Sequence, residues 1–157
     1  MLRLFTVLSL CFVFISPASA EAIESEEWLG KAFTIEDSRC YVGIAKVVLS
    51  VSELTQEDGY LVGDYVLDVP MVKSKSDHGR IKLPVEETFE ELKKNGGVLK
   101  GNAYSGVVEG KINKVVCEIV PEENQAIRLA ITTDHRTINF ISRYTIIEKP
   151  VVETDQG

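Results

Sequence analysis

Apolar and polar residues alternate along two neighbouring runs of the chain, AIRLAI at 126–131 and INFISRYTII at 138–147. Apolar residues at every second position are typical of a β-strand that buries one of its faces. The run between them, TTDHRT at 132–137, contains aspartate and threonine, whose side chains favour turns. We therefore predict that these two runs form an antiparallel hairpin.

The apolar positions also set the register of this hairpin. A four-residue loop at 133–136 places Ile131 opposite Ile138 and Leu129 opposite Phe140, so both apolar faces lie on the same side. A loop of odd length without a bulge would turn one of these faces toward solvent. The sequence therefore predicts both the hairpin and its pairing.

A second pair of alternating runs lies at 40–54 and 60–72. Between them, a three-residue loop at Glu57–Gly59 has glycine where such a loop requires a left-handed residue. This loop predicts two facing pairs, Leu49 with Leu67 and Val51 with Tyr65.

Shorter runs predict further strands at 31–35, 80–83, 98–104 and 107–120. One segment, PVEETFEELKKNGG at 84–97, departs from the alternation. Its apolar residues have helical spacing, glutamates fill its first turn, lysines fill its last turn, and glycine follows. We predict a helix of about ten residues here.

These elements predict an all-β fold with one short helix. The size of the chain and the number of strands favour an antiparallel barrel of about eight strands, lipocalin-like in size. A β-sandwich of two sheets is the alternative that the strand pattern leaves open.

The first 20 residues have the three regions of a signal peptide: Arg3, an apolar stretch at 4–15, and an A-x-A cleavage site ending at Ala20. We therefore predict an exported protein, periplasmic or secreted, that begins at Glu21. The apolar stretch is shorter than the roughly 20 residues of a membrane-spanning helix, and no second stretch follows, so we predict no membrane span.

Removal of the signal peptide at 1–20 leaves 137 of the 157 residues. We divide them into an acidic flexible lead at 21–30, a single β domain at 31–148 and a flexible tail at 149–157. The formal charge of the whole chain is −7, and the signal peptide contributes one positive charge, so the mature chain carries about −8. An acidic surface repels nucleic acid and suits a basic exported partner.

Two cysteines, Cys40 and Cys117, remain in the predicted mature chain. An even number of cysteines in an oxidising compartment favours a disulfide, and we predict one between these two residues. Metal binding is the poorer explanation, because neither cysteine has a second cysteine or a histidine at ligand spacing.

The sequence lacks the common catalytic motifs G-x-S-x-G, H-E-x-x-H and C-x-x-C, and the glycine-rich loops that bind phosphates. His78 and His135 both lie in predicted turns, and each directly follows an aspartate. Adjacent residues on extended chain point to opposite sides, so neither aspartate is placed to orient its imidazole. We expect no catalytic residue, no metal site and no cofactor, and predict that the protein is not an enzyme.

Five of the 11 glycines lie within the fifteen residues 96–110. Glycines of this kind let strands bend around a barrel corner, or they mark a loop that another protein contacts. On the second interpretation, Tyr104, Ser105 and Gly106 form a partner-binding loop.

Ser105-Gly106 is similar to the short Ser-Gly loop that small exported β-barrel inhibitors of lysozyme insert into the enzyme cleft. The similarity covers two of 137 residues, and the aromatic residue, Tyr104, precedes the serine here. The resemblance implies an inhibitor-type contact made by these residues, and membership of that family is not inferred.

Three functions remain open. The first is an exported, non-enzymatic binding or inhibitor-type protein that acts on another exported protein. The second is a small β-barrel carrier of an apolar ligand, which requires a barrel interior that side chains do not fill. Large residues such as Leu67 and Phe140 predict a filled interior and favour the first function. The third is a structural or assembly component of the cell envelope.

Overall fold

The computed structural model describes residues 26–149. The predicted signal peptide, residues 21–25 of the lead and residues 150–157 of the tail lie outside the described residues. The elements are η1 (Glu26–Trp28), β1 (Lys31–Ile35), β2 (Ser38–Val42), β3 (Ala45–Val51), β4 (Leu54–Glu57), β5 (Tyr60–Asp68), η2 (Lys73–Lys75), β6 (Asp77–Pro84), α1 (Phe89–Asn95), β7 (Gly97–Ser105), β8 (Ile112–Val120), β9 (Ala126–Thr132) and β10 (Thr137–Glu148).

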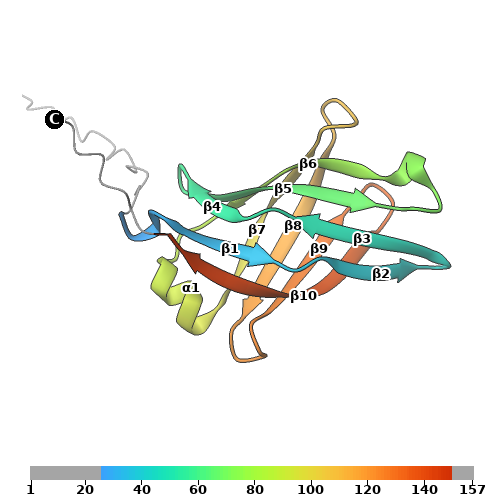
Figure 1. The fold of residues 1–157 in the computed structure, drawn as a ribbon. Coiled ribbons are helices and arrows are strands. Elements are labelled where there is room, and N and C mark those ends of the chain that lie inside the picture. The colour runs from blue at the N-terminus through green and yellow to red at the C-terminus, as the bar shows by residue number, and fades with distance from the viewer. Residues whose placement is uncertain (1–25, 150–157) are drawn as a thin grey trace, which may run out of the picture.

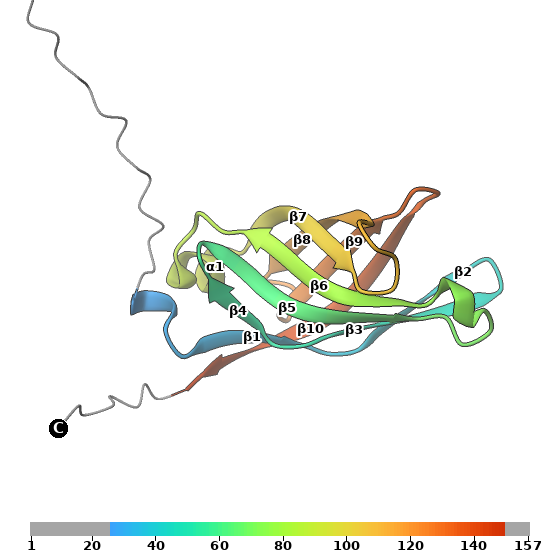
Figure 2. The same cartoon turned by 90° about the horizontal axis from the view of Figure 1, so that it is seen from above.

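The strands form a closed antiparallel barrel, which confirms the predicted fold class and the barrel (Figure 1). Eight strands close the ring in the order β1, β4, β5, β6, β7, β8, β9, β10, and β10 pairs back with β1. The hairpin of β2 and β3 is the insertion between β1 and β4; it pairs with β5 and projects beyond the ring (Figure 2). Neighbours in the ring are therefore mostly neighbours in the sequence.

The hairpin of β9 and β10 has the predicted register. Ile131 pairs with Ile138 and Leu129 pairs with Phe140. The backbone N–H of Thr133 donates to the carbonyl of Arg136 over 2.9 Å, which closes the predicted loop.

The second hairpin has the predicted pairs but a different turn. Leu49 pairs with Leu67 and Val51 with Tyr65, as expected. The loop, however, contains only Asp58 and Gly59, both at positive φ, as in the two-residue turns that match strand twist. Farther along, in the two-residue segment between β3 and β4, Ser52 and Glu53 stand opposite the single residue Asp64. This bulge adds the residue that the shorter loop removes, so the two differences cancel.

Several strands differ in extent from the prediction. The run predicted at 40–54 is divided among β2, β3 and β4, with breaks at 43–44 and 52–53, and the run predicted at 60–72 ends as a strand at Asp68. β6 begins at Asp77, so His78 lies in a strand that pairs with β5, not in a turn. β8 begins at Ile112, and residues 106–111 form a loop.

The helix α1 contains seven residues, fewer than the ten predicted. It begins later because Thr88 caps its N-terminus: the Thr88 hydroxyl accepts from the backbone N–H of Glu91, and the Glu91 carboxylate accepts from the backbone N–H of Thr88. Gly96, at φ 69°, ends the helix. Within residues 26–149, none of the helices has the length and apolar character needed to cross a membrane.

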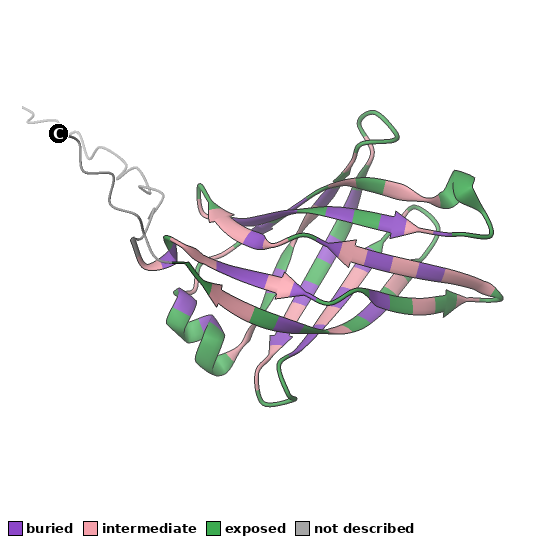
Figure 3. Cartoon of the chain, in the orientation of Figure 1, coloured by how far each residue is buried: buried purple, intermediate pink, exposed green. Residues whose placement is uncertain are grey.

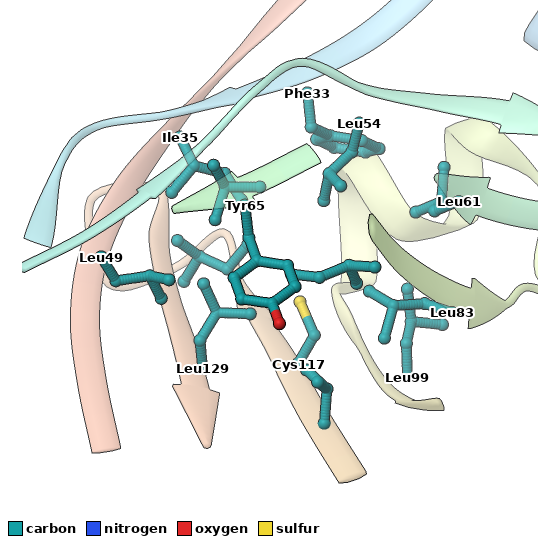
Figure 4. Packing of buried hydrophobic residues seen from close by; sticks show 14 of the residues in the cluster. Phe33, Ile35, Leu49, Leu54, Leu61, Tyr65, Leu83, Leu99, Cys117 and Leu129 are labelled. Atoms are coloured by element: carbon teal, nitrogen blue, oxygen red, sulfur yellow. The ribbon is translucent and has the colours of Figure 1, made fainter. Parts of the chain in front are cut away.

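Buried residues alternate with more exposed ones along the strands of the ring (Figure 3), and the buried side chains form one hydrophobic core. Four aromatic residues of the strands are almost completely buried there: Phe33, Tyr65, Phe140 and Tyr144. Figure 4 shows Tyr65 close to Cys117 and Leu129 in this core. Burying a large side chain stabilises the fold by about 1.5–3 kcal/mol, so these residues dominate the packing energy.

The helix covers one end of the barrel and extends the core there (Figures 1 and 2). The ring of Phe89 lies 5.6 Å from Phe33 and 5.2 Å from Trp28, the latter in a T-shaped arrangement. Trp28 belongs to the segment assigned to the flexible lead, so the packed part of the chain begins before the predicted boundary at residue 31.

Candidate functional site

The end of the barrel opposite α1 contains a cavity of about 450 Å³, which we call the mouth cavity. Four connections surround it: those between β2 and β3, β5 and β6, β7 and β8, and β9 and β10. Valine and alanine line much of its wall, with Ala45 and Val47 on β3 and Val69 just after β5, whereas aromatic rings fill the helix end. Small side chains on this end explain why the barrel is hollow here.

Asn113 is the most informative residue of this cavity. It is the second residue of β8 and is only 4% exposed, although it lines the cavity wall. Its side-chain oxygen Oδ1 is buried and has no hydrogen-bond partner among the described residues. A buried polar atom without a partner costs about 1–3 kcal/mol, so a hydrogen-bond donor at this position would stabilise the protein.

Asp77 lies on the same wall, and both of its carboxylate oxygens accept hydrogen bonds from other groups of the protein. Its Oδ2 accepts from the hydroxyl of Tyr65 over 3.1 Å, and its Oδ1 accepts from the hydroxyl of Ser105 over 2.6 Å and from the N–H of His78. Burial raises the pKa of Tyr65 far above its usual value, and the negative Asp77 raises this pKa further. This carboxylate therefore ties the core to the β7–β8 loop.

Three basic side chains line the cavity on three different segments: Lys75, Lys111 and Arg136. Within residues 26–149, none of the three forms a salt bridge. The acidic residues of the lining are Asp77, which already accepts three hydrogen bonds, and Asp134. The cavity is therefore rimmed by available positive charge in a chain whose overall charge is negative.

The three residues predicted to bind a partner do not share one role. Ser105 faces inward: its hydroxyl donates to Asp77 and accepts from the backbone N–H groups of Val107 and Val108. Gly106 continues this turn and donates its N–H to the carbonyl of His78. Tyr104 is 39% exposed and lies on β7 itself.

Tyr104 borders a second hollow, of about 520 Å³, on the outer surface of the barrel; we call it the Tyr104 groove. Besides Tyr104, it is lined by Val66, His78, Arg80 and Gly106 and their neighbours. A third hollow, at residues 28–32, 55–58 and Lys149, borders the end of the described chain, and we assign no function to it.

The predicted disulfide between Cys40 and Cys117 is absent, and both residues are free thiols. Cys117 is completely buried and belongs to the barrel core, whereas Cys40 lies on β2, outside the closed ring, and pairs with Val47. Burial raises the pKa of both thiols, to about 12 for Cys117. Cys117 lies inside the hydrophobic core, whereas Cys40 is only partly buried and packs against that core from β2.

His78 and His135 lie at different places, His78 at the Tyr104 groove and His135 at the mouth cavity. In the part of the chain that the structure describes, no group of three or more His, Cys, Asp and Glu side chains is arranged to hold a metal ion.

One residue of the mouth cavity, Asn113, is marked in the sequence by the pattern of its strand. In the strand 112–120, Asn113 lies on the same face as Val115, Cys117 and Ile119. It is therefore a polar residue at a position where the alternation predicts a buried apolar one. Comparisons of the chain with known protein families, curated proteins and solved structures find no match.

Proposed function

We propose that this protein is a non-enzymatic binding protein that holds a small, largely apolar ligand in the mouth cavity. One observation carries the proposal: the apolar cavity at one end of an otherwise filled barrel is lined by Asn113, whose buried side-chain oxygen has no hydrogen-bond partner within residues 26–149. Ligand sites are typically concave, mainly apolar and about 300–1,000 Å³ in volume, with a few polar groups that orient the ligand.

The surrounding structure supports a preformed site. The cavity wall consists of paired strands on a packed core, and the Asp77 hydrogen bonds hold the β7–β8 loop against β6. A rigid site loses little conformational freedom when the ligand binds, which favours affinity. Because aromatic side chains fill the helix end, the ligand occupies one end of the barrel and not its whole length.

Binding of the neutral apolar dye N-phenyl-1-naphthylamine tests this function. Ala45→Phe places a ring in the cavity and is expected to weaken dye binding about tenfold or more. The matched control is Ala130→Phe on β9, away from the cavity lining, which is expected to leave binding unchanged. Equal dye binding by wild type and Ala45→Phe, with both folded by circular dichroism, contradicts the proposal.

A second candidate function is the binding of a basic exported protein through the Tyr104 groove. Tyr104 pairs with Ile112 on the neighbouring strand, and both side chains are exposed beside Val66. Exposed aromatic and aliphatic side chains that lie together often form the centre of a protein interface. The acidic charge of the chain supports a basic partner.

Lysozyme is the probe for this second function, because it is a basic exported protein. Tyr104→Ala is expected to weaken lysozyme binding by thirtyfold or so, with an unchanged melting temperature. Ile141→Ala, at another exposed site on β10, is the control. Absence of lysozyme binding by the wild-type protein contradicts this candidate for that partner.

The proposal includes export, since residues 1–20 have the features of a signal peptide. Mass spectrometry of the exported protein is expected to show Glu21 as the first residue. An exported chain that retains Met1 contradicts this part of the proposal.

A further inference from the structure

The polar groups of the mouth cavity specify the ligand more closely than its apolar wall does. We infer that the ligand is an anionic amphiphile that carries a hydroxyl or amide N–H group near its charged head. This inference rests on the proposed function, because it assumes that a small ligand occupies the mouth cavity. Three features carry it: the rim charges, the unpartnered oxygen of Asn113 and the apolar wall.

The rim charges favour an anionic head. Lys75, Lys111 and Arg136 come from the β5–β6, β7–β8 and β9–β10 connections, and they converge on one cavity although the sequence separates them widely. Since none forms a salt bridge with a described residue, their charges remain available to a ligand. These three positive charges outnumber the two carboxylates of the lining, Asp77 and Asp134, so a carboxylate or phosphate at the rim would be attracted more strongly than a cationic head.

Asn113 requires a donor on the ligand. The oxygen of an asparagine amide only accepts hydrogen bonds, so the group that satisfies Asn113 Oδ1 must be an O–H or N–H group. Asn113 follows the rim residue Lys111 by two positions, at the start of β8, so it lies just inside the rim. The donor group therefore belongs close to the charged head, and the apolar part extends past it.

The wall beyond Asn113 suits a hydrocarbon chain. Val47, Leu67 and Val69 are all buried and line the cavity, with Ile138 partly buried beside them. Each methylene group that leaves water for such a wall contributes about 0.8 kcal/mol. An anion without an apolar chain would leave this wall uncovered and would bind only weakly.

Four ten-carbon probes with different heads test the inference on the full mature chain: 3-hydroxydecanoate, decanoate, decanol and decyltrimethylammonium. We expect this same order of decreasing affinity in isothermal titration calorimetry at low salt. Decanoate is expected to bind about tenfold more tightly than decanol, and this difference should shrink at 1 M salt, where charges are screened within about 3 Å. The 3-hydroxyl group is expected to add about fivefold, as one net hydrogen bond does.

Variants assign these preferences to residues. Asn113→Leu keeps a similar volume but removes the acceptor, and is expected to abolish the advantage of 3-hydroxydecanoate while decanoate still binds. The double variant Lys111→Gln with Arg136→Gln is expected to remove most of the preference for decanoate over decanol. Lys100→Gln, on β7 and outside the cavity lining, is the matched control and is expected to change neither preference.

The outcomes separate this inference from the proposed function. Equal binding of decanoate, decanol and decyltrimethylammonium overturns the anionic head but supports an apolar ligand. Equal binding of 3-hydroxydecanoate and decanoate by the wild type overturns the donor near the head. If neither the four probes nor the neutral dye binds, both the inference and the proposed function are overturned.

Discussion

The hydroxyl of Tyr65 donates a hydrogen bond to Asp77 Oδ2 over 3.1 Å, and this bond connects the barrel core to the wall of the mouth cavity. Tyr65 is 2% exposed, so its hydroxyl depends on this one protein partner. Asp77 in turn accepts from Ser105 and thereby fixes the loop that carries Val107 and Val108. The stability of the core and the shape of the cavity are thus coupled through a single carboxylate.

Tyr65→Phe is expected to lower the free energy of unfolding by about 1 kcal/mol, because it removes this bond and leaves one carboxylate lone pair without a donor. Urea denaturation followed by circular dichroism measures the change. Tyr104→Phe is the control: Tyr104 is partly exposed, so its change is expected to stay within about 0.5 kcal/mol. Equal effects of the two substitutions would show that the Tyr65–Asp77 bond contributes nothing.

Alkaline pH is expected to destabilise the protein through the same residue. The usual pKa of tyrosine is 10.0, and burial together with Asp77 raises the pKa of Tyr65 in the folded protein. Above about pH 10 the unfolded chain releases this proton while the folded chain keeps it. The contribution of Tyr65 to the free energy of unfolding is therefore fully present below that pH and is lost as the pH rises. Urea denaturation between pH 8 and 11 should show a smaller loss for Tyr65→Phe than for the wild type, and parallel curves would refute this explanation.

The two cysteines are expected to react with iodoacetamide at different rates. Cys40 is partly exposed and should be alkylated slowly in the native protein, because burial raises its pKa. Cys117 should react only after unfolding, because it is buried and its pKa is raised to about 12. Intact mass spectrometry counts the alkyl groups with and without denaturant. A protein that gains none even in denaturant, and gains two after reduction, contains the disulfide that the structure lacks.

Gly101→Ala is expected to lower the free energy of unfolding by about 2 kcal/mol, since a methyl group there would clash with the carbonyl oxygen of Lys82 on the adjacent strand. Thermal and urea unfolding measure this change. Gly59→Asn is the control, because Gly59 has open space around it and asparagine tolerates its left-handed φ. A Gly101→Ala protein as stable as the wild type would show that β6 and β7 separate easily.

The parts of the fold that depend on local pattern could be predicted from the sequence. The hairpin at 132–137 was predictable because the apolar residues of both strands allow one register. The bulge at Ser52–Glu53 was not, because the shorter loop at Asp58–Gly59 cancels its effect on the facing pairs. Only the chemistry of the loop, with aspartate before glycine, favoured the two-residue turn.

The candidate site was less predictable because its residues meet only in three dimensions. Lys75, Lys111 and Arg136 have no shared motif, and the barrel alone brings them to one rim. The disulfide prediction was wrong for a related reason: a count of cysteines contains no information about the distance between them. The Thr88 cap, in contrast, was visible as T-x-x-E, the pattern that pairs a threonine with a glutamate three residues later.

The pairing of β1 with β10 has a consequence for the order of the chain. Lys31 stands opposite Glu148, and the N–H of Lys149 donates to the carbonyl of Gly30, so the two ends of the described chain lie side by side. A circular permutant that joins these ends with a short linker, and opens the chain within the exposed β8–β9 turn at 122–125, would keep every strand beside its present neighbours. The ring of strands thus has no required starting point, and such a permutant would retain the mouth cavity, which the new ends do not touch.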